Sequence, residues 1–202
     1  MYNMKNIILI IILFLSNMVN SQNVISLTNK KHEDKKNGNY FKDTNGSLDP
    51  FIGIWVWENA TNTAKMTIKY IKKEMHDGNG LLPYKEDILI GGYKYEEYGI
   101  TIIDNLAFSA NYTDINYANI KSVFLTGPGL PEIRVQITDV AKRKNLMGKM
   151  KLNSNPNLPS LDPLTATMTL VPQKQWVNGT LYPDKVSLPG NTFPFEMVFT
   201  KQ

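Results

Sequence analysis

The sequence contains no cysteine, two histidines and two arginines, Arg134 and Arg143. The lack of cysteine excludes thiolate nucleophiles, cysteine-ligated zinc and disulfide bonds, so packing alone must stabilise the fold. His32 and His76 lie in a charged segment and a polar turn, where a histidine is usually a solvated surface residue. There is also no GxSxG turn and no phosphate-binding glycine motif. A hydrolase is therefore ranked behind the two non-catalytic hypotheses given below. An enzyme is not expected, and no cofactor is predicted.

The positive charge is spread along the chain. The 22 lysines and arginines exceed the 18 acidic residues by a net charge of +4. The lysines mostly alternate with apolar residues, whereas nucleic-acid binders concentrate basic residues on one face. This pattern predicts solvated strand faces and no nucleic-acid partner.

Residues 1–21 have the organisation of a signal peptide. Lys5 precedes an apolar run from Ile7 to Leu15, and Val19-Asn20-Ser21 offers modest residues for a peptidase. The run is far shorter than the ~20 apolar residues that span a bilayer. We expect cleavage before Gln22, export to the periplasm or the extracellular space, and no stable membrane insertion afterwards.

Residues 22–48 are rich in Asn, Lys, Asp and Gly and have few large apolar side chains. Such a composition predicts a flexible polar arm, with Val24 to Leu27 pairing only loosely on a sheet edge. The stretch "DTNGSLD" from Asp43 to Asp49 places oxygen donors at alternate positions, as a calcium loop does. It lacks the glycine and the glutamate of an EF-hand, so ordinary turn chemistry is the preferred interpretation, and no metal site is predicted.

From residue 49 to 202 the apolar residues recur with a period of two, which indicates half-buried antiparallel strands. No long apolar stripe of helical period interrupts them, and turn signals such as "DGNG" and "TGPGLP" separate them. This pattern predicts an all-β domain, an antiparallel up-and-down meander that closes into a β-barrel. Gly91 and Gly92, inside one strand, are expected to mark a bulge or a sharp bend. The expected strands cover residues 53–58, 64–74, 88–96, 99–104, 119–125, 132–139, 146–152, 164–170 and 195–201.

Two tryptophans share one face of the first of these strands, in the stretch "FIGIWVW". Gly53 and Trp55 resemble the Gly-x-Trp opening of lipocalin-like and other calycin barrels. In those barrels the tryptophan closes the bottom against a basic residue near the end of the last strand. Lys201, in the terminal "MVFTKQ", stands at the corresponding position. The resemblance therefore implies a lipocalin-like barrel closed by Gly53, Trp55 and Lys201.

The wider chain is similar to a family of small exported bacterial proteins of unknown function. The shared features are the signal peptide, an F-x-G-x-W opening, the strand "ILIGGYKY" and the terminal strand. The resemblance covers residues 48–202 and implies no activity.

Two functional hypotheses from different classes remain open. The first is binding of a small, largely apolar ligand in or at the mouth of the barrel, because tyrosine and tryptophan are abundant and residues 176–191 form a long irregular stretch. The alternative is a structural or protein-interaction module of the cell envelope with a solid barrel core and an unknown protein partner. The residues expected to bind a ligand are Trp57, Met66, Ile68, Val135, Met168, Trp176 and Tyr182.

Overall fold

The computed structural model describes residues 22–35, 38–76, 84–107, 119–125, 129–157, 162–172, 175–177, 180–182 and 190–202. The expected signal peptide therefore lies outside the described residues. Within them there is no α-helix, and so no helix long and apolar enough to cross a membrane. The regular structure consists of β-strands and three short 3₁₀ turns, Leu27–Asn29, His32–Asp34 and Asp49–Phe51.

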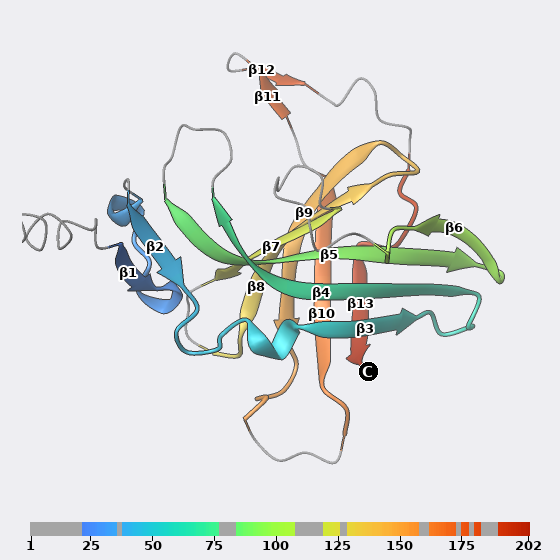
Figure 1. Cartoon of the computed structure of the whole chain (residues 1–202). Coiled ribbons are helices and arrows are strands. Elements are labelled where there is room, and N and C mark those ends of the chain that lie inside the picture. Colours follow the sequence, from blue (N-terminus) through green and yellow to red (C-terminus); the bar gives the residue numbers. More distant parts are fainter. Residues whose placement is uncertain are drawn as a thin grey trace, which may run out of the picture.

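Eight strands form a closed antiparallel β-barrel (Figure 1). Each pairs with the next barrel strand along the chain, and the last pairs with the first through Lys201 and Trp55. The barrel strands are β3 (Gly53–Glu58), β4 (Ala64–His76), β5 (Lys85–Glu97), β7 (Ile120–Leu125), β8 (Glu132–Asp139), β9 (Lys144–Leu152), β10 (Thr165–Pro172) and β13 (Glu196–Lys201). The predicted up-and-down barrel is confirmed.

The alternating apolar residues of the strands build the core of the barrel. In β8, for example, Ile133, Val135 and Ile137 are fully buried, while Arg134 between them is exposed. Because side chains of a strand alternate between its two faces, this period is what separates the interior from the solvent. Phe195 is an exception to the expected pattern, since it lies just before β13 with 39% of its surface exposed.

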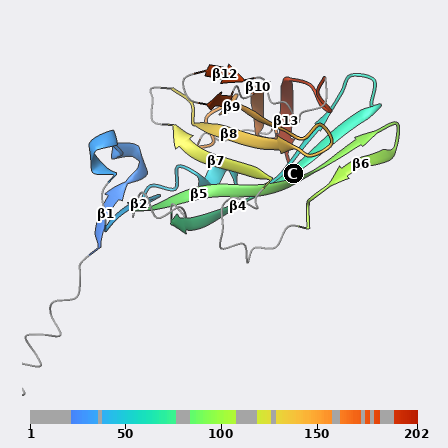
Figure 2. The same cartoon turned by 90° about the horizontal axis from the view of Figure 1, so that it is seen from above.

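The N-terminal segment differs from the expected flexible arm. It forms β1 (Asn23–Ser26) and β2 (Asn39–Lys42), which pair in parallel with each other, and β2 pairs in parallel with β5. Leu27, Phe41 and Leu48 are buried in the same core cluster as the barrel side chains. Figures 1 and 2 show this segment at one end of the barrel. Composition misled the prediction because a few well-placed apolar side chains, together with strand pairing, are enough to hold a polar segment.

Three further strands lie beside the barrel path. β6 (Ile100–Asp104) forms a hairpin with the end of β5, and this pairing contains an irregularity between Tyr95 and Glu96. A bulge or a sharp bend was expected at Gly91 and Gly92. The pairing of β5 with β4 has no bulge there, but the other neighbour of β5 changes from β7 at Gly91 to β6 at Lys94. β11 (Gln175–Val177) and β12 (Thr180–Tyr182) form a separate two-stranded sheet.

Candidate functional site

The interior of the barrel is filled by the side chains that were expected to bind a ligand there. Met66, Ile68, Val135 and Met168 all have 0% exposed surface and belong to one core cluster. A side chain with no accessible surface cannot border a void large enough for water. A ligand could therefore lie among these four side chains only by displacing some of them.

Trp55 is fully buried where β3 begins, at the end of the barrel that the N-terminal segment covers. Its indole Nε1 donates a hydrogen bond to the carbonyl oxygen of Phe51 at 2.8 Å. Lys201 Nζ lies 5.8 Å from the centroid of the Trp55 ring and donates to the carbonyl oxygen of Pro50 at 2.7 Å. Burial lowers the pKa of Lys201. Lys201 and Trp55 are thus in contact where β13 pairs with β3.

Gly53 allows this arrangement through its backbone. Its φ of 117° is a conformation that side chains with a Cβ rarely adopt. The Lys201 side chain passes over it, with its Cε 3.5 Å from where a Cβ would stand. Gly53, Trp55 and Lys201 thus lie in contact at the start of β3.

Trp57, two residues further along β3 toward the turn into β4, is half-buried. It borders a pocket of about 450 Å³ that we call the mouth pocket. This pocket is lined by Trp57, Asn59, Ala64, Tyr95, Glu97, Asn191, Thr192, Phe193, Pro194 and Phe195. Three other surface hollows, of about 400, 360 and 420 Å³, have no aromatic side chain in their linings. The mouth pocket therefore combines aromatic surface with a concave shape.

One wall of the mouth pocket is the segment that precedes β13. The buried carboxylate of Asp139 accepts hydrogen bonds from the backbone N–H of Thr192 at 2.9 Å and from its hydroxyl at 2.7 Å. The neighbouring Phe193 ring packs against Tyr93 and Tyr95, with centroids 5.7 and 5.9 Å away. The wall is thus held by a buried polar contact and by aromatic packing.

The adjoining wall is the end of β5. Tyr95 and Glu97 are two positions apart and so share one face of the strand. The Tyr95 hydroxyl donates to Glu97 Oε1 at 2.9 Å. Burial, reinforced by this bond to Glu97, raises the pKa of Tyr95. The hydroxyl thereby stays protonated and holds the carboxylate in place at the pocket.

The structure brings only some of the expected ligand-binding residues to this site. Trp57 lies in the mouth pocket, while the four interior residues form the core beneath it. Trp176 and Tyr182 lie in β11 and β12, where Trp176 pairs with Leu181, but their side chains lie outside the described part of the structure. Sequence reasoning missed Glu97 and the wall at residues 191–195. The alternation in "YKYEE" could have placed Glu97 beside Tyr95, but no local signal places the wall.

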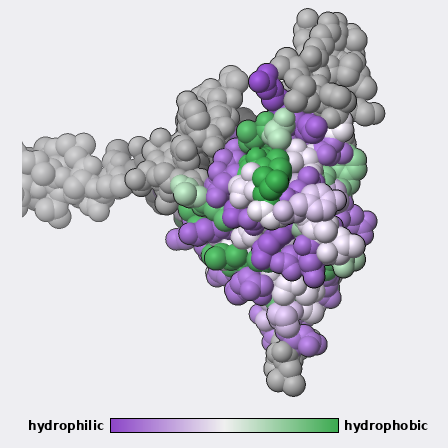
Figure 3. All heavy atoms as spheres, turned by 90° about the vertical axis from the view of Figure 1, so that its right-hand side faces the viewer, coloured by the Kyte–Doolittle hydropathy of each residue, from purple (hydrophilic) through white to green (hydrophobic). Residues whose placement is uncertain are grey.

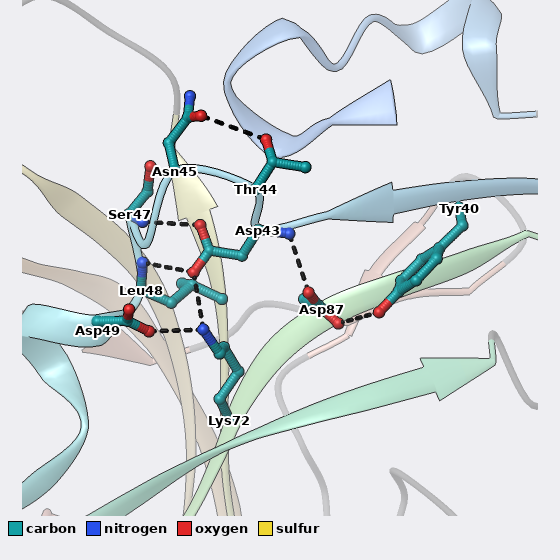
Figure 4. Close-up of polar contacts among 9 residues, drawn as sticks. All are labelled: Tyr40, Asp43, Thr44, Asn45, Ser47, Leu48, Asp49, Lys72 and Asp87. Carbon is teal, nitrogen blue, oxygen red and sulfur yellow. Dashed lines mark hydrogen bonds and ion pairs between the residues drawn. The ribbon is translucent and has the colours of Figure 1, made fainter. Parts of the chain in front are cut away.

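A second polar cluster lies between the N-terminal segment and the barrel (Figure 4). Asp43 accepts hydrogen bonds from the backbone N–H groups of Ser47 and Leu48 at 2.7 and 3.1 Å. Lys72 of β4 forms ion pairs with both Asp43 and Asp49, at 3.3 and 2.5 Å. This is the turn chemistry preferred for "DTNGSLD". Within the described residues, no group of three or more His, Cys, Asp or Glu side chains is placed to hold a metal ion.

The same cluster fastens β2 to β5. The buried carboxylate of Asp87 accepts the Tyr40 hydroxyl at 2.6 Å and the backbone N–H of Asp43 at 2.9 Å. Lys30 forms an ion pair with the neighbouring Glu86 at 2.5 Å. All of these groups are engaged in holding the N-terminal segment, so we assign the cluster a structural role.

Comparison with known proteins gives a family without an activity. No curated protein and no solved structure matches the chain. The model of a family described as a family of unknown function, DUF6705, matches residues 4–202. The match includes the N-terminal segment that was expected to lie outside the resemblance, in agreement with its packing on the barrel. The chain therefore belongs to the family of unknown function DUF6705.

Proposed function

We propose that this protein is an exported, non-catalytic binding protein that holds a small ligand in the mouth pocket. The observation that carries the proposal is the aromatic pocket of about 450 Å³ above a filled barrel interior. Ligand pockets typically measure roughly 300 to 1,000 Å³ and combine apolar walls with a few polar groups. The mouth pocket falls within that volume range, and its open lining combines the accessible rings of Trp57 and Phe195 with the polar side chains of Asn59, Glu97, Asn191 and Thr192.

The export part of the proposal is supported by the sequence of residues 1–21. If the segment is a signal peptide, protein purified from the medium or the periplasm should begin at Gln22. N-terminal sequencing measures this directly. Full-length protein retained in a membrane fraction would contradict it.

Ligand binding can be measured through tryptophan emission and thermal stability. A ligand that stacks on Trp57 should change the emission, and at ~100 times its dissociation constant it should stabilise the fold by roughly 2.7 kcal/mol. Trp57→Ala should abolish both responses. As a matched control, Val198→Ala alters an exposed side chain of β13 outside the pocket and should leave both responses intact. A broad screen of aromatic, aliphatic and sugar-like probes with no saturable response would contradict the proposal.

A protein-interaction role is the second candidate, and one observation favours it. The β5–β6 hairpin exposes Tyr98, Ile100 and Ile102 at 80%, 66% and 44% of their surface. Figure 3 views the side of the molecule on which this hairpin lies, and apolar side chains gather there among polar ones. Light scattering of the purified protein, compared with that of an Ile100→Lys variant, would reveal self-association through this face.

A further inference from the structure

We propose that the mouth pocket selects a small organic cation, an ammonium group that carries apolar substituents. This inference rests on the proposed ligand-binding function and gives the chemical class of the ligand. Three observations support it: the charge of the pocket lining, the interaction partners of one carboxylate in it, and the aromatic surface around that carboxylate.

Among the described residues, the lining of the mouth pocket contains one carboxylate, Glu97, and no lysine or arginine. This is notable in a chain with 22 basic and 18 acidic residues, whose lysines are spread over most strands. The other hollows at or near this end, which include Glu58 and Lys65, contain both signs of charge. The mouth pocket is therefore acidic within a chain whose net charge is positive.

Apart from Glu196 of β13, which lies outside the pocket lining and likewise forms no ion pair among the described residues, Glu97 differs from the other strand glutamates in its partners. Five of them, Glu58, Glu74, Glu86, Glu96 and Glu132, form ion pairs with lysines at 2.5 to 3.0 Å. Among the described residues, no lysine or arginine pairs with Glu97, whose recorded partner is the neutral Tyr95 hydroxyl. That hydrogen bond uses one carboxylate oxygen and fixes the direction of the other. A cationic ligand would supply the counter-charge that the protein does not.

The aromatic side chains around Glu97 fit the same ligand. A cation over an aromatic face is attracted by the ring quadrupole, and ammonium groups are recognised by clusters of such rings. Trp57 and Phe195 present accessible ring surface in the pocket, and the buried rings of Tyr95 and Phe193 pack against each other in its wall. An anionic ligand such as a fatty acid would instead place its carboxylate near Glu97, with no basic side chain among the described lining residues to balance it.

Choline and its neutral isostere 3,3-dimethylbutan-1-ol test this inference, because they share size and shape and differ in charge. We expect choline to bind the purified protein at least tenfold more tightly, by calorimetric titration. Glu97→Gln keeps an acceptor for the Tyr95 hydroxyl and should lower the affinity for choline at least tenfold, to that of the alcohol. The matched control Glu96→Gln removes a neighbouring carboxylate that already pairs with Lys94 and should change neither affinity.

A second variant keeps the test independent of the Tyr95 contact. Asn191→Lys places a cation in the lining while Glu97 remains, and it should also abolish the preference for choline. Equal affinities of the wild-type protein for the two compounds, or an unchanged preference in both variants, would overturn the cation selectivity. The ligand-binding proposal would survive that result if the alcohol still bound and Trp57→Ala abolished its binding. If neither compound bound at all, the cation inference would be rejected. The ligand-binding proposal would then be tested separately by the screen of aromatic, aliphatic and sugar-like probes.

Discussion

Replacement of Trp55 by alanine is the most direct test of how the barrel is closed. The side chain has 0% exposed surface and belongs to the core cluster. Its ring also carries two specific contacts, the hydrogen bond to the Phe51 carbonyl at 2.8 Å and the Lys201 ammonium at 5.8 Å from the ring centroid. The substitution therefore removes a large buried volume and two polar interactions together.

The expected loss in free energy of unfolding is dominated by the volume. Truncation of a buried tryptophan to alanine typically costs about 3 to 5 kcal/mol. The lost hydrogen bond leaves the Phe51 carbonyl without its donor and adds about 1 kcal/mol. Lys201→Ala should lose less, since a partly exposed cation over a ring contributes ~0.5 to 1 kcal/mol and the lost hydrogen bond to the Pro50 carbonyl adds about 1 kcal/mol.

Trp57→Ala provides a matched comparison, because the same residue type is removed two positions along the same strand. Trp57 is only half-buried, so its loss should cost about 1 to 2 kcal/mol, in proportion to the apolar area it buries. Urea titration of the three variants, monitored by circular dichroism, measures the differences. A Trp55→Ala protein within about 0.5 kcal/mol of wild type, the usual span of a surface change, would refute the reasoning. So would an equal loss at the two tryptophans.

Two further predictions concern buried polar groups. Asp87→Ala leaves the Tyr40 hydroxyl and the backbone N–H of Asp43 without their acceptor. It should therefore lower the free energy of unfolding by about 2 to 4 kcal/mol and speed amide hydrogen exchange in β2. Unchanged exchange would argue against the role of Asp87 in anchoring β2. Burial raises the pKa of Tyr70 above its ordinary value of 10.0, so the unfolded chain loses the phenolic proton first and the free energy of unfolding should fall as pH rises above 10. Urea titrations between pH 8 and 11 should show a shallower fall for Tyr70→Phe than for wild type, and equal slopes would contradict this assignment.

The barrel strands were predictable because their signal is local. A period of two decides which side chains of a strand face the core, and it needs no knowledge of the neighbouring strands. The same period put Trp55 and Trp57 on one face, and the lack of a helical period excluded other fold classes. Residues 132–139 and 53–58, for example, were predicted with the bounds that the structure has.

What the structure alone decided involves residues that are distant in the sequence. The parallel pairing of Tyr40 with Lys85 draws the N-terminal segment into the fold, and nothing in residues 22–48 indicates that partner. Likewise, the hydrogen bond from the Thr192 backbone N–H to Asp139 holds the wall of the mouth pocket in place. Such contacts depend on which distant segments the tertiary fold brings together. A local sequence pattern does not contain that information.

The packing of side chains inside the barrel was also decided by the tertiary structure. Gly91 leaves room for the ring of Tyr70, and a methyl group at Gly148 would overlap the carbonyl oxygen of Thr169 on the neighbouring strand. Whether Met66 and Met168 line a cavity or fill it likewise depends on the summed volumes of side chains from every strand of the barrel. The sequence by itself thus determined which faces are apolar and that the chain forms an antiparallel barrel. Only the tertiary structure decided that the barrel is filled and that its concave aromatic surface lies at the mouth, because volume and proximity are properties of the assembled strands and not of any one of them.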